Sequence, residues 1–216
     1  MDYARARKHM VDSQVRPDNV TDRRLIHAMS DVARERFAPS DQATLVYSDT
    51  ILKLAETRAM MAPRDFAKLV DAAEIGPGDA ILDIACGLGY STAVLARLGE
   101  AVVAVEADEA LATKAEANLA AAGVDTAAVI TGDLVKGAPD QGPFNVIIIE
   151  GAVEREPDAL KAQLADGGRL LFVRRDGAVG KAVLVVRTGD RFGERTLFNS
   201  AAPLLAEYRR EPEFVF

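Results

Sequence analysis

One short stretch of the 216-residue chain, residues 80–92, constrains the possible folds more than any other. It begins with a short apolar run, residues 80–84, that carries one acid, Asp83. This pattern is typical of a buried strand whose carboxylate lies at the carboxyl edge of a sheet. Small residues follow at alternate positions: Ala85, Gly87 and Gly89. They allow a sharp turn and the close approach of a ligand. Because a helical stretch begins at residue 91, this turn has the position at which open α/β sheets bind nucleotide-like ligands.

The glycine pattern excludes two common nucleotide sites. A dinucleotide fingerprint requires a third glycine three residues after Gly89, and that position is Thr92. A Walker loop requires a Gly-Lys-Ser or Gly-Lys-Thr tripeptide, which the sequence lacks. Instead, a second acid, Glu106, ends the next apolar run, residues 101–106. Carboxylates at two neighbouring strand ends suit a ligand with a cationic group and a ribose diol, and they repel a pyrophosphate. S-adenosylmethionine matches this description, whereas NAD does not.

Three segments resemble the cofactor motifs of the Rossmann-like, S-adenosylmethionine-dependent methyltransferases. Residues 83–89 are similar to the first motif, with Ala85 in place of its first glycine. Glu106 matches the acid that binds the ribose hydroxyls in that superfamily, and Asp133 matches the residue that contacts the adenine amino group. The alternative is a glycine-containing turn beside unrelated acids. The resemblance implies S-adenosylhomocysteine as product and a cofactor site made of these residues: Asp83, Ala85, Cys86, Gly87, Gly89, Tyr90, Ser91, Glu106, Ala107, Asp133, Leu134 and Glu150.

The N-terminal part carries a second, narrower resemblance. Residues 10–16, 20–29 and 32–39 resemble the opening of the protein-L-isoaspartate O-methyltransferases. Those enzymes methylate the α-carboxylate of isoaspartyl residues in age-damaged proteins, and a helical N-terminal segment helps to enclose their active site. The likeness continues through the cofactor motifs to residues 163–172 and so covers most of the chain. It implies an isoaspartyl protein or peptide as the partner and substrate.

The sequence departs from that family at the loop that carries the family's catalytic Ser. With Pro63 as the anchor, Met61 occupies the Ser position, and a thioether cannot donate the hydrogen bond of a hydroxyl. Thr57 and Arg58 are the candidate catalytic substitutes, and Arg58 is a possible partner for a substrate carboxylate. The alternative for this segment is an ordinary helix that continues towards residue 60.

A second departure is Glu150, which replaces a neutral residue of the family after the fourth predicted strand. As a carboxylate it would repel an acceptor carboxylate by on the order of 1 kcal/mol or more, and it would favour a cationic or neutral acceptor. The alternative is a solvated acid that pairs with Arg155.

Strands that alternate with helices predict an α/β fold: a Rossmann-like methyltransferase with a mostly parallel twisted sheet and helices on both faces. A C-terminal antiparallel hairpin, residues 181–187 and 191–198, completes the sheet, and residues 201–205 and 214–216 are expected to cover its edge. We expect an N-terminal helical extension and substrate-side segment over residues 1–76 and the methyltransferase core over residues 77–216. The parallel strands are expected over residues 80–84, 101–106, 126–131, 144–149 and 168–173.

Composition limits the partners and the compartment. A net charge of −7 argues against nucleic acid as the main partner, and no apolar run is long enough to span a membrane. The basic start of the chain has no apolar segment after it, so we expect no secretion signal. A single cysteine, Cys86, fits a reducing, cytoplasmic compartment, and no residue cluster has metal-site spacing. The sequence leaves the oligomeric state open.

Three functional interpretations follow from these patterns. The first is an S-adenosylmethionine-dependent O-methyltransferase that repairs isoaspartyl proteins. The second is a cofactor-binding sensor or interaction protein with an altered acceptor site, which Met61 and Glu150 motivate. The third retains methyl transfer with a different acceptor.

Overall fold

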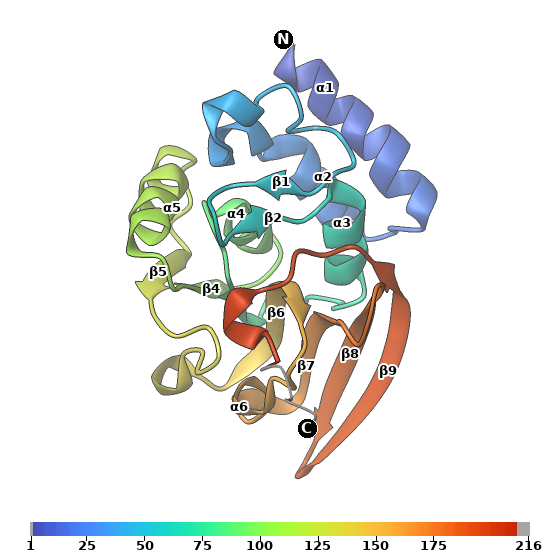
Figure 1. Cartoon of the computed structure of the whole chain (residues 1–216), viewed down its shortest axis with the longest axis vertical. Coiled ribbons are helices and arrows are strands. Elements are labelled where there is room, and N and C mark those ends of the chain that lie inside the picture. The colour runs from blue at the N-terminus through green and yellow to red at the C-terminus, as the bar shows by residue number, and fades with distance from the viewer. Residues whose placement is uncertain (1, 211–216) are drawn as a thin grey trace, which may run out of the picture.

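One seven-stranded sheet organises the computed structural model, which describes residues 2–210 (Figure 1). The strand order is β5-β4-β3-β6-β7-β8-β9. Pairs from β5 to β7 are parallel, whereas the β7–β8 and β8–β9 pairs are antiparallel. The predicted mostly parallel sheet with a C-terminal antiparallel hairpin is therefore confirmed. The strands are β3 Ala80–Ile84, β4 Ala101–Glu106, β5 Ala127–Thr131, β6 Phe144–Val153, β7 Leu164–Arg174, β8 Gly180–Thr188 and β9 Arg191–Ser200.

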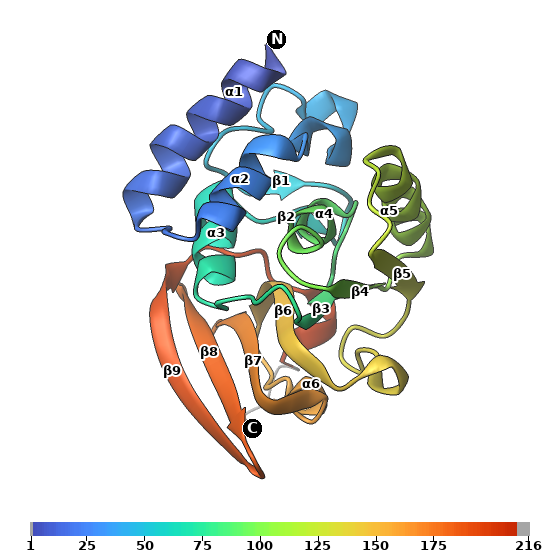
Figure 2. The ribbon, with the colours of Figure 1, turned by 180° about the vertical axis from the view of Figure 1, so that it is seen from behind.

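Helices lie against both faces of this sheet, and the N-terminal helices gather on one side of it (Figures 1 and 2). After α1, residues 11–15 continue as a π-helical turn and residues 16–18 as a 3-10 turn that contains Pro17. Within residues 2–210, no helix combines the length and the apolar character needed to cross a membrane. The helices are α1 Tyr3–Met10, α2 Arg23–Asp31, α3 Pro63–Asp71, α4 Tyr90–Leu95, α5 Glu109–Ala121 and α6 Asp158–Lys161.

The central strands are covered on both faces, and this explains their nearly continuous apolar sequences. Ile148 of β6 packs into a cluster with apolar residues of α1 to α5. Its neighbours Ile147 and Ile149 point to the opposite face, where they meet Leu160 of α6 and Tyr208. Successive side chains alternate in this way because the strand repeat is two residues. The carboxyl ends of β3 and β4 thus lie between two layers of buried apolar side chains.

The fourth parallel strand runs further than its apolar pattern predicted. A bulge between Ile148 and Ala152 interrupts its pairing with β7, and the strand continues to Val153. Glu150 therefore lies inside β6 and is only 5% exposed. The alternative of a solvated Glu150 paired with Arg155 is wrong, because Arg155 donates instead to the Glu207 carbonyl oxygen.

The chain after β9 does not cover the edge of the hairpin as expected. Residues 201–205 cross to the end of β6, where Leu204 bridges Ala152 in the parallel sense. The Ala152 N–H donates to the Pro203 carbonyl at 2.7 Å, so the extended end of β6 binds this segment. Residues 214–216, the other expected cover, lie outside the described residues.

A small antiparallel hairpin, β1 Leu52–Lys53 and β2 Ala59–Met60, replaces the helix considered for this segment. The N–H groups of Leu54 and Ala55 both donate to the Arg58 carbonyl, which closes a tight loop. A helix is excluded because the backbone hydrogen bonds of this stretch run across the hairpin. In Figure 1 the hairpin lies in front of α4, between α3 and α5.

We expect Asp108→Ala to lower the free energy of unfolding by about 1 kcal/mol. Asp108 is the N-cap of α5: its Oδ1 accepts from the N–H groups of Ala110 and Leu111 at 2.9 and 3.1 Å. The substitution removes this acceptor, so two N–H groups in the first turn of α5 lose their protein partner and can bond only to water. Urea unfolding measures the change, with Glu116→Ala on the exposed side of α5 as the control. Equal stability of the two variants would contradict the capping role.

Candidate functional site

The turn between β3 and α4 has the backbone geometry that its small residues predicted. Ala85, Gly87 and Gly89 all have positive φ, at 66°, 59° and 93°. For Ala85 this left-handed conformation costs roughly 1–2 kcal/mol, whereas glycine adopts it freely. The Ala85 N–H nevertheless donates to the Val105 carbonyl at 2.9 Å, which ties the turn to β4. The chain therefore keeps the shape of the turn with an alanine at its first position.

Asp83 is fully buried at the end of β3. Its Oδ2 accepts from the hydroxyls of Ser91 and Thr92 at 2.8 and 2.7 Å, which fixes the start of α4. Burial raises the pKa of Asp83 to about 6, and the charge of Glu106 adds to the rise, whereas the two hydroxyls oppose it. Oδ1 has no hydrogen-bond partner within the described part of the chain. Such an orphaned buried oxygen indicates a site for a further donor or a cation.

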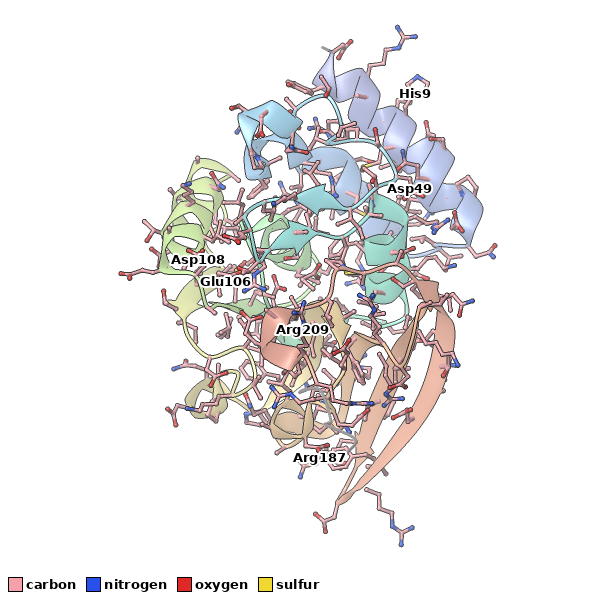
Figure 3. The ribbon with its side chains drawn as sticks, viewed as in Figure 1. His9, Asp49, Glu106, Asp108, Arg187 and Arg209 are labelled. Carbon is pink, nitrogen blue, oxygen red and sulfur yellow. The ribbon has the colours of Figure 1, made fainter. Side chains whose placement is uncertain are left out.

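Glu106, at the end of β4, accepts hydrogen bonds from the backbone around it. Figure 3 shows it close to Asp108, at the start of α5. Glu106 is 0% exposed and accepts from the N–H of Gly87 at 2.9 Å, of Ala107 at 2.8 Å and of Asp108 at 3.1 Å. These bonds hold its carboxylate directly beside the β3–α4 turn. The two strand-end acids predicted to flank one ligand thus lie on either side of the same loop.

Arg58 of the β1–β2 hairpin is bound to this carboxylate. Its Nε lies 3.1 and 3.0 Å from the two oxygens of Glu106, and its Nη2 lies 2.9 Å from Oε1. Nη2 also contacts Glu207 Oε1 at 2.9 Å. The hairpin meets the turn a second time at Leu54, because a Cβ added to Gly87 would lie 2.6 Å from Leu54 Cδ1. The hairpin therefore lies directly on the turn and on its acid.

A small cavity lies beside the turn, between it and the β1–β2 hairpin. Its volume is about 10 Å³, which is room for roughly one water molecule. Met61, Tyr90, Ser91 and Glu150 are among its lining residues. The Tyr90 hydroxyl and Glu150 Oε1 are buried and have no partner among residues 2–210. Burial raises the pKa of Glu150 well above its ordinary value, with a further rise from Asp83 and an opposing effect of Arg34, and so favours the neutral acid.

The structure brings most of the predicted site residues to the turn and places Asp133, Leu134 and Thr57 outside it. The residues from Asp83 to Ser91, together with Glu106 and Ala107, surround the turn. Asp133 lies after β5, where it accepts from the Val135 N–H, and Leu134 is buried in the same apolar cluster as Ala85. Thr57 is exposed beside Arg58. No group of three or more His, Cys, Asp or Glu side chains in the described chain could hold a metal ion.

Cys86 is buried beneath the turn against Ala104 and Ala115. Burial raises the pKa of its thiol well above the ordinary value, and this keeps the thiol protonated and unreactive. Cys86 therefore packs as a small apolar residue beneath the turn.

Sequence reasoning missed three residues of the site: Leu54, Arg34 and Glu207. Arg34 is 1% exposed, donates to the Met61 carbonyl at 2.7 Å and lies with its guanidinium 4.5 Å from the Tyr90 ring centre. These residues come from segments far from the turn in the sequence. No local pattern could have found them, because only folding brings them to it.

A family model described as protein-L-isoaspartate(D-aspartate) O-methyltransferase matches residues 5–191. The chain belongs to this family. Relatives with the name protein-L-isoaspartate O-methyltransferase include one from Roseiflexus sp. (strain RS-1), 37% identical over 172 residues, or 80% of this chain and 78% of the relative. Another, from Methanoregula boonei, is 34% identical over 203 residues, or 94% of each chain. The family resemblance predicted from the sequence motifs is thus confirmed.

Solved structures extend the likeness to the whole fold. A protein-L-isoaspartate O-methyltransferase matches with a TM-score of 0.82 at 22% identity, over 92% of this chain and 65% of that chain. A Plasmodium falciparum structure assigned to the same enzyme, in complex with S-adenosyl-L-homocysteine, matches with a TM-score of 0.79 at 17% identity, over 93% and 98% of the two chains. These matches confirm the predicted Rossmann-like methyltransferase fold.

Protein-L-isoaspartate O-methyltransferases depend on S-adenosylmethionine, as predicted, and the donor set of this chain fits that cofactor. Asp83 and Glu106 provide carboxylates on both sides of a turn with little side-chain bulk, and one oxygen of Asp83 is free within the described chain. In this conformation the β1–β2 hairpin lies where a ligand would approach the turn. The chemistry of the site therefore suits the cofactor.

Proposed function

We propose that this chain is an S-adenosylmethionine-dependent O-methyltransferase that esterifies isoaspartyl carboxylates in damaged proteins or peptides. The observation that carries the proposal is the pair of buried strand-end acids, Asp83 and Glu106, on the two sides of the β3–α4 turn. This pair occurs in a chain whose family match covers residues 5–191. The single buried thiol, Cys86, supports a reducing, cytoplasmic location.

In this proposal Glu106 accepts hydrogen bonds from the ribose hydroxyls, and Asp83 holds the turn through Ser91 and Thr92. Asp133 is the proposed partner of the adenine amino group. When bound, the cofactor supplies a methyl group on a positively charged sulfur, which is a strong electrophile. An ionised acceptor carboxylate needs no general base. The main task of the protein is to align the acceptor and to exclude water.

The cavity beside Met61 is the proposed acceptor end of the site. Glu150 there has a pKa raised by burial, so its neutral acid form does not repel an acceptor carboxylate as an ionised acid would. A neutral carboxyl group also has an O–H donor, which Met61 lacks. Arg58 and Thr57 remain candidate acceptor contacts, and Arg58 can meet an acceptor only after it leaves Glu106.

We expect the purified chain to form a methyl ester on an isoaspartyl peptide at saturating S-adenosylmethionine. The matched aspartyl peptide places its carboxylate one methylene group away, and we expect its rate to be about 100-fold lower because misplacement of a reacting atom has a cost of that order. Transfer of labelled methyl groups to the two peptides measures both rates. Absence of ester on the isoaspartyl peptide would contradict the proposed acceptor. Labelling of other acceptors would then separate a different methyltransferase from a cofactor-binding sensor.

A further inference from the structure

We propose that Arg58 limits cofactor affinity: it competes with the ribose of the cofactor for Glu106, and the β1–β2 hairpin that carries it must lift before the cofactor binds. The inference rests on the proposed function, because it takes Glu106 as the acceptor of the ribose hydroxyls.

The hydrogen-bonding capacity of Glu106 is the first argument. Two carboxylate oxygens offer about four lone-pair positions. Oε1 already accepts from the Nε and Nη2 of Arg58 and from two backbone N–H groups, those of Ala107 and Asp108. Oε2 accepts from Arg58 Nε and the Gly87 N–H. Two ribose hydroxyls can therefore bind Glu106 only if the guanidinium leaves.

The position of Leu54 is the second argument, and it is independent of charge. Gly87 has no side chain, which leaves its backbone open to close approach. Leu54 Cδ1 occupies that space, since it lies only 2.6 Å from the point at which a Cβ of residue 87 would stand. The same hairpin thus covers the turn with an apolar side chain and neutralises the acid with a guanidinium.

The hairpin has few bonds that hold it in place. Its strands contain two residues each, and its loop is closed by the two N–H groups that donate to the Arg58 carbonyl. Its charged anchors are the contacts of Arg58 with Glu106 and with Glu207 of the C-terminal segment. Leu52 and Met60 of the two strands are buried in the core, so the part of the hairpin that can open is its loop, residues 54–58, which has few backbone bonds and half-buried or exposed side chains apart from Arg58. Loss of the guanidinium therefore shifts the hairpin towards the open form.

Because only molecules with an open hairpin bind the cofactor, the apparent association constant is the intrinsic constant multiplied by the open fraction. We expect Arg58→Met, which retains the apolar stem and removes the guanidinium, to bind S-adenosylhomocysteine about tenfold more tightly than the wild type. Leu54→Ala should bind it several-fold more tightly. Lys53→Met removes a cation from an exposed position of the same hairpin and should leave the affinity unchanged.

Titration calorimetry with S-adenosylhomocysteine measures these affinities, and circular dichroism checks that each variant is folded. Hydrogen exchange of the wild type supplies a second readout: residues 54–58 should exchange faster when the ligand is bound. If Arg58→Met does not fold, Leu54→Ala and the exchange experiment carry the test.

The outcomes separate the two proposals. Equal affinity of the wild type, Arg58→Met and Leu54→Ala, with unchanged exchange of residues 54–58, would overturn the competition and leave the proposed function intact. Weaker binding by Arg58→Met would also overturn it, because Arg58 would then assist the cofactor. Absence of binding in every variant would overturn both the competition and the assignment of the ribose to Glu106.

Discussion

Replacing Glu106 by alanine is expected to lower the free energy of unfolding by about 3–5 kcal/mol. Glu106 is 0% exposed and is the main partner of Arg58, whose side chain is only 1% exposed. Without the carboxylate, the guanidinium retains only its contact with Glu207 as a charged partner in the described structure. The N–H groups of Gly87, Ala107 and Asp108 also lose their acceptor. An uncompensated buried charge is among the most destabilising changes in a protein core.

Urea unfolding followed by circular dichroism measures this loss. In the double variant Glu106→Ala/Arg58→Met neither charge of the buried pair remains, so the double variant should be more stable than Glu106→Ala alone. Glu156→Ala serves as the control, because Glu156 pairs with Arg174 and Lys161 near the surface and should change stability by no more than about 1 kcal/mol. A loss below about 1 kcal/mol for Glu106→Ala would contradict the buried ion pair.

Asp83→Asn is expected to remove a pH dependence of stability worth about 3 kcal/mol. The pKa of Asp83 is about 6 in the folded chain, against about 3.9 for an unfolded aspartate. Between these values the folded state binds more protons than the unfolded state, so stability falls as the pH rises. The stabilisation by protonated Asp83 is therefore fully present below about pH 4 and is lost as the pH rises through about 6. A difference of about two pK units corresponds to about 3 kcal/mol.

Free energies of unfolding at pH values from about 4 to 7 test this expectation in the two proteins. The wild type should lose about 3 kcal/mol relative to Asp83→Asn over that range. Part of this difference comes from Glu150, whose pKa is raised by burial and raised further by the charge of Asp83. Thr92→Val removes a hydroxyl that lowers the pKa of Asp83 and should move the midpoint of the wild-type change to higher pH. Parallel stability curves for wild type and Asp83→Asn would exclude the raised pKa.

Several elements were predictable because their signals are local. The apolar run of β4 was predicted with the bounds that the structure has, Ala101–Glu106, and β3 was predicted as Ala80–Ile84. A parallel strand that is buried on both faces is apolar at consecutive residues. A sharp turn with positive φ requires glycine or another small residue at the positions concerned. The two acids were also predictable, since parallel strands that end at one sheet edge bring their last side chains together.

Other features depended on contacts between distant segments. Arg58 lies 48 residues from Glu106 in the sequence, and the short hairpin that joins them has no periodic pattern long enough to recognise. The extension of β6 through Glu150 accompanies the bulge between Ile148 and Ala152 and the pairing of Ala152 with Leu204. Neither the bulge nor the pairing with Leu204 can be predicted from the residues near Glu150. For this reason the burial of Glu150 was not predicted.

The sequence by itself therefore determined the order of the elements, the turn at residues 83–89 and the acids beside it, because periodicity, glycine content and motif spacing are properties of neighbouring residues. Only the tertiary structure decided the state of those acids. Burial raised the pKa of Asp83 and Glu150, and the packing of a distant hairpin placed Arg58 on Glu106. Both effects depend on which side chains exclude water from a carboxylate, and that is set by contacts across the whole fold.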